Sequence, residues 1–294
     1  MGLTATAVAG SIFIPCPAPG ATAVARPARQ GETSTNMIAI ISDIHSNIEA
    51  MTAVFDDIEA RGCSRVFCLG DVIGYGPNPD ACLDLIGRKV ELTLMGNHDF
   101  AVLYQPNNFN VGAEGACYWT RQYLAELPDA EKRNRYWELL GAMPVKHTIE
   151  APELKMDELT FVHGSPRKPV NEYIFPDDIY NAPSKLQGAF DRFNGLCFVG
   201  HTHVPGCFFL EPPDFYSPDD LDDVYEVEPG KKVLINVGSV GQPRDRDNRA
   251  SYVMLEEGKV RFVRVEYDID AVLEKVRAIE ALDDYLGIRL KEGR

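Results

Sequence analysis

Five of the six histidines in this chain lie where apolar runs end, beside or close to a glycine or an aspartate. They occur in the segments SDIHSN, GNHD, VHGS and GHTH, as His45, His98, His163, His201 and His203, and only His147 lies elsewhere. One histidine beside a glycine is weak evidence, because an isolated histidine is more often structural. Five histidines in the same setting indicate one shared chemical site.

Two aspartates and an asparagine share that setting and extend the choice of ligand atoms. With four of the histidines they give seven candidate metal ligands: Asp43, His45, Asp71, Asn97, His163, His201 and His203. This mixture of imidazole, carboxylate and amide oxygen favours a divalent transition metal, such as Mn, Fe, Co, Ni or Zn, over Ca or an iron–sulfur cluster. Seven ligands exceed what one ion needs. Two ions about 3.5 to 4 Å apart, sharing a bridging carboxylate, would use them all, and such a pair suits the hydrolysis of phosphate esters.

The spacing within two of the segments supports convergence of these side chains. Asp43 and His45 are two residues apart, as are His201 and His203. In extended backbone, residues with this spacing project to the same face. Each pair is therefore expected to address one small volume.

Hydrophobic periodicity predicts the elements that would position these residues. Strands are predicted at residues 37–42, 65–69 and 90–95, with helices at 47–60 and 79–86 between them. Strands separated by helices imply βαβ units, parallel strands and right-handed crossovers. Asp43, Asp71 and Asn97 then follow the carboxyl ends of consecutive strands, where open α/β sheets bind their ligands.

Residues 101–147 depart from this alternation and are predicted to form a helical insertion. Two helices are expected, at 111–127 and 129–140, separated by Pro128. They either pack against the sheet edge or form a lid over a substrate pocket. Further strands are predicted at 159–164, 196–201, 207–210, 233–238, 251–255 and 260–266, with a final helix at 270–281. Because these late strands follow one another directly, a second, partly antiparallel sheet stacked on the first is expected.

Composition limits the class of protein. The chain has 294 residues, 45% of them apolar, which is enough for one large domain. No apolar run approaches the roughly 18 to 20 residues of a membrane span. Seven cysteines without a CxxC pair argue against a disulfide framework or a zinc knuckle, and favour a cytoplasmic protein. The net charge of −15 argues against stable nucleic-acid binding.

Two segments are set apart by composition. Residues 211–230 contain eight Asp or Glu and no Lys or Arg. They are predicted to form a solvated surface loop, with metal attraction or partner binding as the alternative. Residues 1–36 are rich in Ala, Pro, Thr and Gly and are predicted to be a disordered extension, or to reflect a start assigned upstream of Met37. Residues 37–294 then form the functional domain.

The combined motifs resemble a known family. DIH (43–45), GD (70–71), GNHD (96–99), HGS (163–165) and GHTH (200–203) are similar, in order, to the five signature blocks of the calcineurin-like metallophosphoesterases. DIHSN, GDVIGYGPNP and NVGSVGQPRD (236–245) most resemble the small prokaryotic phosphodiesterase branch. The resemblance implies an α/β fold: a four-layer αββα sandwich of two stacked mixed β-sheets flanked by helices.

The same resemblance implies roles for the ligands and cofactors. Asp43, His45 and His203 would hold one divalent ion, with manganese the first choice. Asn97, His163 and His201 would hold the second, and Asp71 would bridge both together with a hydroxide that attacks phosphorus in line.

Two further residues of the GNHD segment are expected to act on the leaving group. His98 would protonate the leaving oxygen or stabilise its charge, and Asp99 would set the orientation or pKa of His98. Capping of the following turn is the alternative role for Asp99.

Departures from the pattern narrow the substrate class. Protein serine/threonine phosphatases of the family carry GDxVDRG and GNHE, whereas this chain has GDVIGYG and GNHD, so that class is disfavoured. Arg167 and Arg244 are candidate phosphate-binding residues, or else surface charges. The expected partner is a small phosphoester, first of all a phosphodiester. The alternatives are a symmetrical dinucleoside-polyphosphate hydrolase and a noncatalytic scaffold of the same fold. The sequence predicts no oligomeric state.

Overall fold

Helices and strands alternate through the first third of the chain, as the hydrophobic pattern predicts. The computed structural model describes residues 37–294, so both predictions for residues 1–36 lie outside the described residues. The strands are β1 (Ile38–Ile41), β2 (Arg65–Cys68), β3 (Leu92–Thr93), β4 (Lys146–Ala151), β5 (Met156–Val162), β6 (Leu196–Val199), β7 (Gly206–Leu210), β8 (Pro213–Tyr216), β9 (Val224–Glu226), β10 (Val233–Asn236), β11 (Ala250–Glu256) and β12 (Lys259–Val265). The α-helices are α1 (Ile48–Ala60), α2 (Pro79–Lys89), α3 (Asn97–Leu103), α4 (Val111–Ala125), α5 (Ala130–Ala142), α6 (Asp178–Asn181), α7 (Pro183–Phe190), α8 (Ile269–Arg277) and α9 (Tyr285–Ile288). Three 3₁₀ turns, η1 (Pro152–Leu154), η2 (Asp219–Leu221) and η3 (Arg289–Glu292), complete the described elements.

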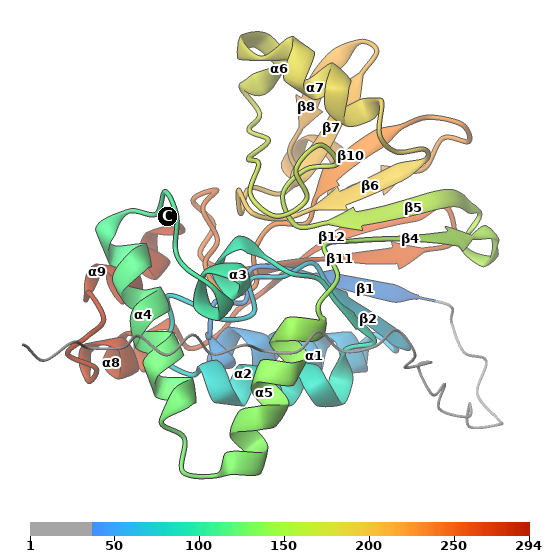
Figure 1. Cartoon of the computed structure of the whole chain (residues 1–294). Coiled ribbons are helices and arrows are strands. Elements are labelled where there is room, and N and C mark those ends of the chain that lie inside the picture. The colour runs from blue at the N-terminus through green and yellow to red at the C-terminus, as the bar shows by residue number, and fades with distance from the viewer. Residues whose placement is uncertain (1–36) are drawn as a thin grey trace, which may run out of the picture. The chain divides into compact units, whose positions relative to one another are not determined.

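The strands form two mixed six-stranded sheets (Figure 1). The first has the order β3-β2-β1-β11-β12-β9, and the second has the order β4-β5-β6-β10-β7-β8. Strands β1, β2 and β3 are parallel, as are β5, β6 and β10, while the remaining pairs are antiparallel. Each sheet therefore has a parallel half whose carboxyl ends can carry ligands.

Alternation along the strands divides the hydrophobic side chains among three cores. Ile38 and Ile40 of β1 face the second sheet, whereas Ala39 and Ile41 face the helices on the other side. The outer face of the first sheet is covered by α1, α2 and α5, and that of the second by α6 and α7 (Figure 1). The four-layer αββα sandwich expected from the resemblance is confirmed, including the helical insertion.

Three local expectations were wrong. Strand β3 is only two residues long where a strand at 90–95 was expected, and the GNHD segment that follows begins helix α3. Strand β4 was not predicted; it lies at the edge of its sheet and is mostly exposed, so its side chains carry little hydrophobic signal. The acidic segment 211–230 is not a plain loop, because it contains β8, η2 and β9.

The late strands also divide differently from the expectation. Strands β11 and β12 form a hairpin that joins the first sheet through pairing of β11 with β1, whereas β5, β6, β7 and β10 join the second sheet. Within residues 37–294 no helix is long and apolar enough to cross a membrane. The six cysteines in this range are free, and the cytoplasmic location stays a prediction.

Candidate metal centre

The candidate ligands follow the carboxyl ends of parallel strands in both sheets. Asp43 follows β1, Asp71 follows β2 and Asn97 lies just past β3, all in the first sheet. His163 follows β5, and the GHTH segment follows β6, both in the second sheet. The site is therefore built at one edge shared by the two sheets.

The backbone that presents these side chains is left-handed rather than extended. Positive φ angles of 50° to 65° occur at five of the seven candidate ligands: Asp43, His45, Asp71, His201 and His203. The expectation that the two-residue spacing acts through extended backbone was wrong. Non-glycine residues in this region cost of the order of 1–3 kcal/mol each, and they concentrate at functional sites.

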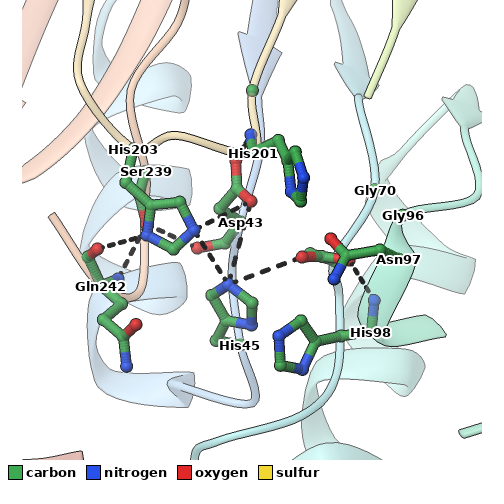
Figure 2. Close-up of polar contacts among 12 residues, drawn as sticks. Asp43, His45, Gly70, Gly96, Asn97, His98, His201, His203, Ser239 and Gln242 are labelled. Atoms are coloured by element: carbon green, nitrogen blue, oxygen red, sulfur yellow. Dashed lines mark hydrogen bonds and ion pairs between the residues drawn. The ribbon is translucent and has the colours of Figure 1, made fainter. Parts of the chain in front are cut away.

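Asp43, His45 and His203 form the first cluster. The two imidazole rings face each other, and the Asp43 carboxylate lies beside both, as Figure 2 shows. Its Oδ1 is 3.2 Å from His203 Nε2 and 3.8 Å from His45 Nε2, and the two ring nitrogens are 3.2 Å apart. All three side chains are buried. Their ligand atoms therefore point into one small volume.

Asn97, His163 and His201 form the second cluster together with Asp71. His163 Nε2 lies 3.0 Å from Asn97 Oδ1, 3.2 Å from His201 Nδ1 and 3.4 Å from Asp71 Oδ2. The same Asp71 oxygen is 3.7 Å from His45 Nε2 in the first cluster. Asp71 is thus the one carboxylate placed between the two groups.

The lone pairs that face one another in the first cluster fit a bound cation better than hydrogen bonds between the side chains. The Nδ1 atom of His203 lies 2.5 Å from the carbonyl oxygen of Gln242, to which a neutral ring donates its only proton. His203 Nε2 then carries a lone pair that faces His45 Nε2 and an oxygen of Asp43. A ring nitrogen fixed in this way is the form that binds metal.

Ionisation in the metal-free site follows from burial and neighbouring charge. Burial opposes the negative charge on Asp43, but the adjacent His203 lowers the pKa of Asp43 below its usual range. Burial, and then repulsion from His163, lowers the pKa of His201 to about 3, so this ring is neutral. Burial also opposes the charge on His163, yet Asp71 raises its pKa to about 9. A metal must therefore displace a proton from His163, as is general for imidazole ligands.

His98 lies beside the metal clusters without belonging to the two sets of predicted ligands. Its ring is 4.8 Å from the His45 ring and 4.3 Å from the Tyr75 ring, and its backbone N–H donates to Asp71 Oδ1 at 2.7 Å. Its Nδ1 is 3.5 Å from Cys117 Sγ, which comes from α4 of the insertion. Burial lowers the pKa of His98 to about 4.

The structure does not bring the Asp99 carboxylate to the ring of His98. Its two oxygens instead accept from the backbone N–H groups of Asp71, Val72, Ile73 and Gly96 at 2.7–3.2 Å. The expected contact with His98 is therefore absent among the described residues. Asp99 holds the loop that carries Asp71, and it caps the start of α3, which was the alternative role.

The two candidate arginines are placed differently. Arg244 donates its backbone N–H to the carbonyl of His203 at 3.3 Å, and its guanidinium lies 5.9 Å from the centre of the Tyr75 ring. Arg167 points toward Glu172, with 3.6 Å between Nε and Oε2, and its Cδ lies near Gly188 of α7. The backbone N–H of Arg167 also donates to Ser165 Oγ of the VHGS segment at 3.1 Å, so both arginines contact the metal-binding segments through their backbone.

Three residues outside the predicted ligand set also support the centre. The Ser239 hydroxyl donates to the carbonyl of Asp43, and the carbonyl of Gln242 accepts from the ring of His203. Tyr173 stacks on His201 with 3.7 Å between ring centres. The segment NVGSVGQPRD was the available signal for the first two, and nothing in the sequence indicated the third.

Two stacked mixed sheets with buried His/Asp clusters at one edge define an α/β protein with a candidate metal site. Residues 37–259 match the model of the calcineurin-like phosphoesterase superfamily domain. The chain belongs to this family and is a metallophosphoesterase.

Individual relatives agree with this assignment. The chain is 38% identical over 273 residues to an uncharacterized protein of Methanocaldococcus jannaschii, a match that covers 88% of this chain and 99% of that protein. The crystal structure of a metallophosphoesterase from Sphaerobacter thermophilus is similar, with a TM-score of 0.71 and 35% identity over 88% of this chain and 99% of that one. A hypothetical protein of Pyrococcus horikoshii shares the fold, with a TM-score of 0.64 and 17% identity over 88% of this chain and 98% of that one.

Proposed function

We propose that the protein hydrolyses phosphodiester bonds, with phosphomonoesters as secondary substrates, at a centre of two divalent metal ions. The observation that carries the proposal is the position of Asp71 Oδ2 between the two clusters, 3.7 Å from His45 Nε2 and 3.4 Å from His163 Nε2. A shared carboxylate is what a pair of closely spaced ions requires.

The side chains divide between the two ions as the resemblance implies. Asp43, His45 and His203 would hold one ion, Asn97, His163 and His201 the other, and Asp71 both. When bound, the ions would neutralise charge on the phosphoryl oxygens. They would also lower the pKa of bound water, so that hydroxide is available at neutral pH. Manganese is the first choice, and Fe, Co, Ni or Zn suit the same ligands.

His98 is proposed to act on the leaving group. Its backbone N–H donates to Asp71, and its ring offers a nitrogen within 4.8 Å of ligand atoms of Asp71 and His45, next to the metal clusters. A proton held on this imidazole would pass to the leaving oxygen as the ester bond breaks. Arg244 is proposed to bind phosphoryl oxygens, whereas the described position of Arg167 beside Glu172 gives that residue no support.

Hydrolysis of bis-p-nitrophenyl phosphate tests the proposal. Protein loaded with Mn²⁺ is expected to release p-nitrophenol, and chelation is expected to abolish the activity. Asp71→Ala and Asn97→Ala should each reduce kcat/KM at least 100-fold, while His147→Ala, a substitution on the edge strand β4, serves as the matched control. Full activity of metal-stripped protein or of Asp71→Ala would refute the mechanism.

The same assay separates the remaining alternatives. A noncatalytic scaffold would bind Mn²⁺ without turnover, although all seven ligand side chains are present and buried in the described structure. A dinucleoside-polyphosphate hydrolase would cleave diadenosine tetraphosphate far faster than simple diesters. A panel that adds cyclic nucleotides, phosphomonoesters and phospholipid diesters would place the natural substrate among these classes.

A further inference from the structure

A thiol from the helical insertion faces the ring of His98. Cys117 lies on the buried side of α4 and is 1% exposed, and its Sγ is 3.5 Å from His98 Nδ1. Burial raises the pKa of the Cys117 thiol, so the thiol keeps its proton at neutral pH and can donate it to a hydrogen bond. The contact joins the insertion to the residue that is proposed to act on the leaving group.

The protein closes off the Nδ1 edge of the His98 ring. A Cβ on Gly74 would lie 2.5 Å from Nδ1, and Gly74 has a φ of 92°, so a side chain at this position would clash with the ring and strain the backbone. Cys117 lies against the same nitrogen. Nε2 is therefore the nitrogen of His98 that is left for a substrate.

Ring contacts hold the plane of the imidazole but do not select which nitrogen faces the substrate. The rings of Tyr75 and Phe109 lie 4.3 Å and 4.7 Å from the His98 ring, centre to centre, and that of His45 lies 4.8 Å away. An imidazole turned over about its Cβ–Cγ bond has nearly the same shape, so aromatic packing distinguishes the two orientations poorly. A hydrogen bond to one nitrogen does distinguish them.

The thiol also determines where a neutral imidazole keeps its proton. An S–H that donates to Nδ1 needs a lone pair there, so the proton of the neutral ring is then on Nε2. The described hydrogen bonds of the Asp99 carboxylate go to backbone amides, and the contact to Nδ1 comes from Cys117.

We propose that Cys117 is a positioning residue for His98: its S–H donates to Nδ1 and thereby directs an Nε2–H toward the leaving oxygen of the substrate. The inference rests on the proposed function, in which His98 acts on that oxygen. It also gives the helical insertion a role, which is to hold the ring of His98 through Cys117 and Phe109.

The tautomer of His98 tests this role without reference to turnover. Zn²⁺ is diamagnetic, so Zn²⁺-loaded protein with nitrogen-labelled histidine is suited to long-range nitrogen–proton NMR spectra, in which His98→Ala identifies the His98 signals. In wild-type protein at neutral pH, His98 should carry its proton on Nε2. Cys117→Ala removes the donor and should shift the signals toward a mixture of the two tautomers. Cys117→Ser keeps a donor and should retain more of the Nε2–H form.

Steady-state kinetics separate positioning from a role in packing. In Mn²⁺-loaded Cys117→Ala, kcat on alkyl diesters should fall about three- to tenfold, which is the scale of one hydrogen bond. KM, Mn²⁺ affinity and the rate on bis-p-nitrophenyl phosphate, which has a good leaving group, should change little. Cys117→Ser should recover part of the lost kcat. A role in packing alone would lower Tm without changing the ratio of the two rates, which would contradict the proposal.

Cys82→Ala is the matched control. Cys82 is a free, buried cysteine on the helix α2, and it belongs to the same hydrophobic cluster as Cys117. Its substitution should lower Tm by a similar amount, while the ratio of the two rates stays equal to that of wild type. Cys117→Val, which also lacks a donor, covers the case in which Cys117→Ala does not fold.

Two results would refute the positioning role, and they differ from failure of the function itself. An Nδ1–H tautomer of His98 in wild-type protein would overturn it, as would an unchanged tautomer together with an unchanged ratio of rates in a folded variant without the thiol. Absence of any Mn²⁺-dependent hydrolysis would instead refute the proposed function.

Discussion

The four amides bound by Asp99 give this carboxylate a role in holding the metal loop. An asparagine at this position keeps one acceptor oxygen but presents an NH₂ group to donors that need an acceptor. An unsatisfied buried donor costs about 1–3 kcal/mol. We expect Asp99→Asn to lower Tm and to weaken Mn²⁺ binding in calorimetry. Asp129→Asn, which alters an exposed cap of α5, should change neither by much, and a normal Mn²⁺ affinity in Asp99→Asn would contradict the role.

The position of His98 predicts a loss of rate that depends on the leaving group. His98→Ala should still bind Mn²⁺, because all seven candidate ligands are unchanged. Its kcat should fall about 10²–10⁴-fold for alkyl leaving groups, which is the usual contribution of general acid catalysis, and much less for p-nitrophenol. Steady-state rates on a series of aryl and alkyl diesters would measure this. An equal loss across the series would show that His98 has another role.

Residue types at the centre were predictable from sequence, but their surroundings were not. Asp43 and His201 were identified because metal chemistry restricts the choice of ligand. Cys117 reaches the site through the packing of α4, and no local pattern encodes that docking. The described hydrogen bonds of the Asp99 carboxylate go to four backbone amides, and its expected effect on His98 stays a prediction.

At the scale of elements, the start of α1 is linked directly to the metal-binding loops. Asn47 caps α1 by accepting from the N–H of Ala50 at 3.0 Å, and its Nδ2 donates to the carbonyl of Gly241 at 2.9 Å. Asn110 caps α4 by accepting from Ala113 only. Both asparagines therefore cap a helix, and Asn47 in addition holds the loop that contains Gly241.

This difference makes a matched pair of substitutions informative. Loss of a helix cap costs about 0.5–2 kcal/mol. The free energy of unfolding of Asn110→Ala, measured in urea, should fall by that amount while its activity is unchanged. That of Asn47→Ala should fall further, and this variant should also bind Mn²⁺ more weakly. Identical effects of the two substitutions would show that the bond to Gly241 does not matter for the centre.

Elements with strong periodicity were predictable, and those whose existence depends on distant partners were not. Helix α1 was expected from the spacing of its buried residues Met51, Val54 and Ile58, and the structure has it. The expected strand at 90–95 is reduced to Leu92 and Thr93, and α3 begins at Asn97. Sheet membership of β11 follows from pairing with β1 some 200 residues earlier, which a local pattern does not contain.

For the molecule as a whole, metal removal should lower stability. Binding to the folded state alone stabilises it by about 4.1 kcal/mol at a ligand concentration 1,000 times Kd. For a domain of this size, each kcal/mol corresponds to about 2–4 °C in Tm. Chelation of Mn²⁺-loaded protein should therefore lower Tm by about 8–16 °C in calorimetry. Asp71→Ala should show little dependence of Tm on Mn²⁺, and an equal dependence would place the ions elsewhere.

The shared edge of the two sheets also determines when in folding the metal can bind. His45 and His203 are 158 residues apart in the sequence, and Ser239 is hydrogen-bonded to Asp43, which lies 196 residues earlier. Contacts of such long sequence separation form late, because the loop between them must be closed first. The ions would then bind only after the fold is nearly complete. They would slow its opening and leave the rate of its formation unchanged, unlike a metal that nucleates a small domain.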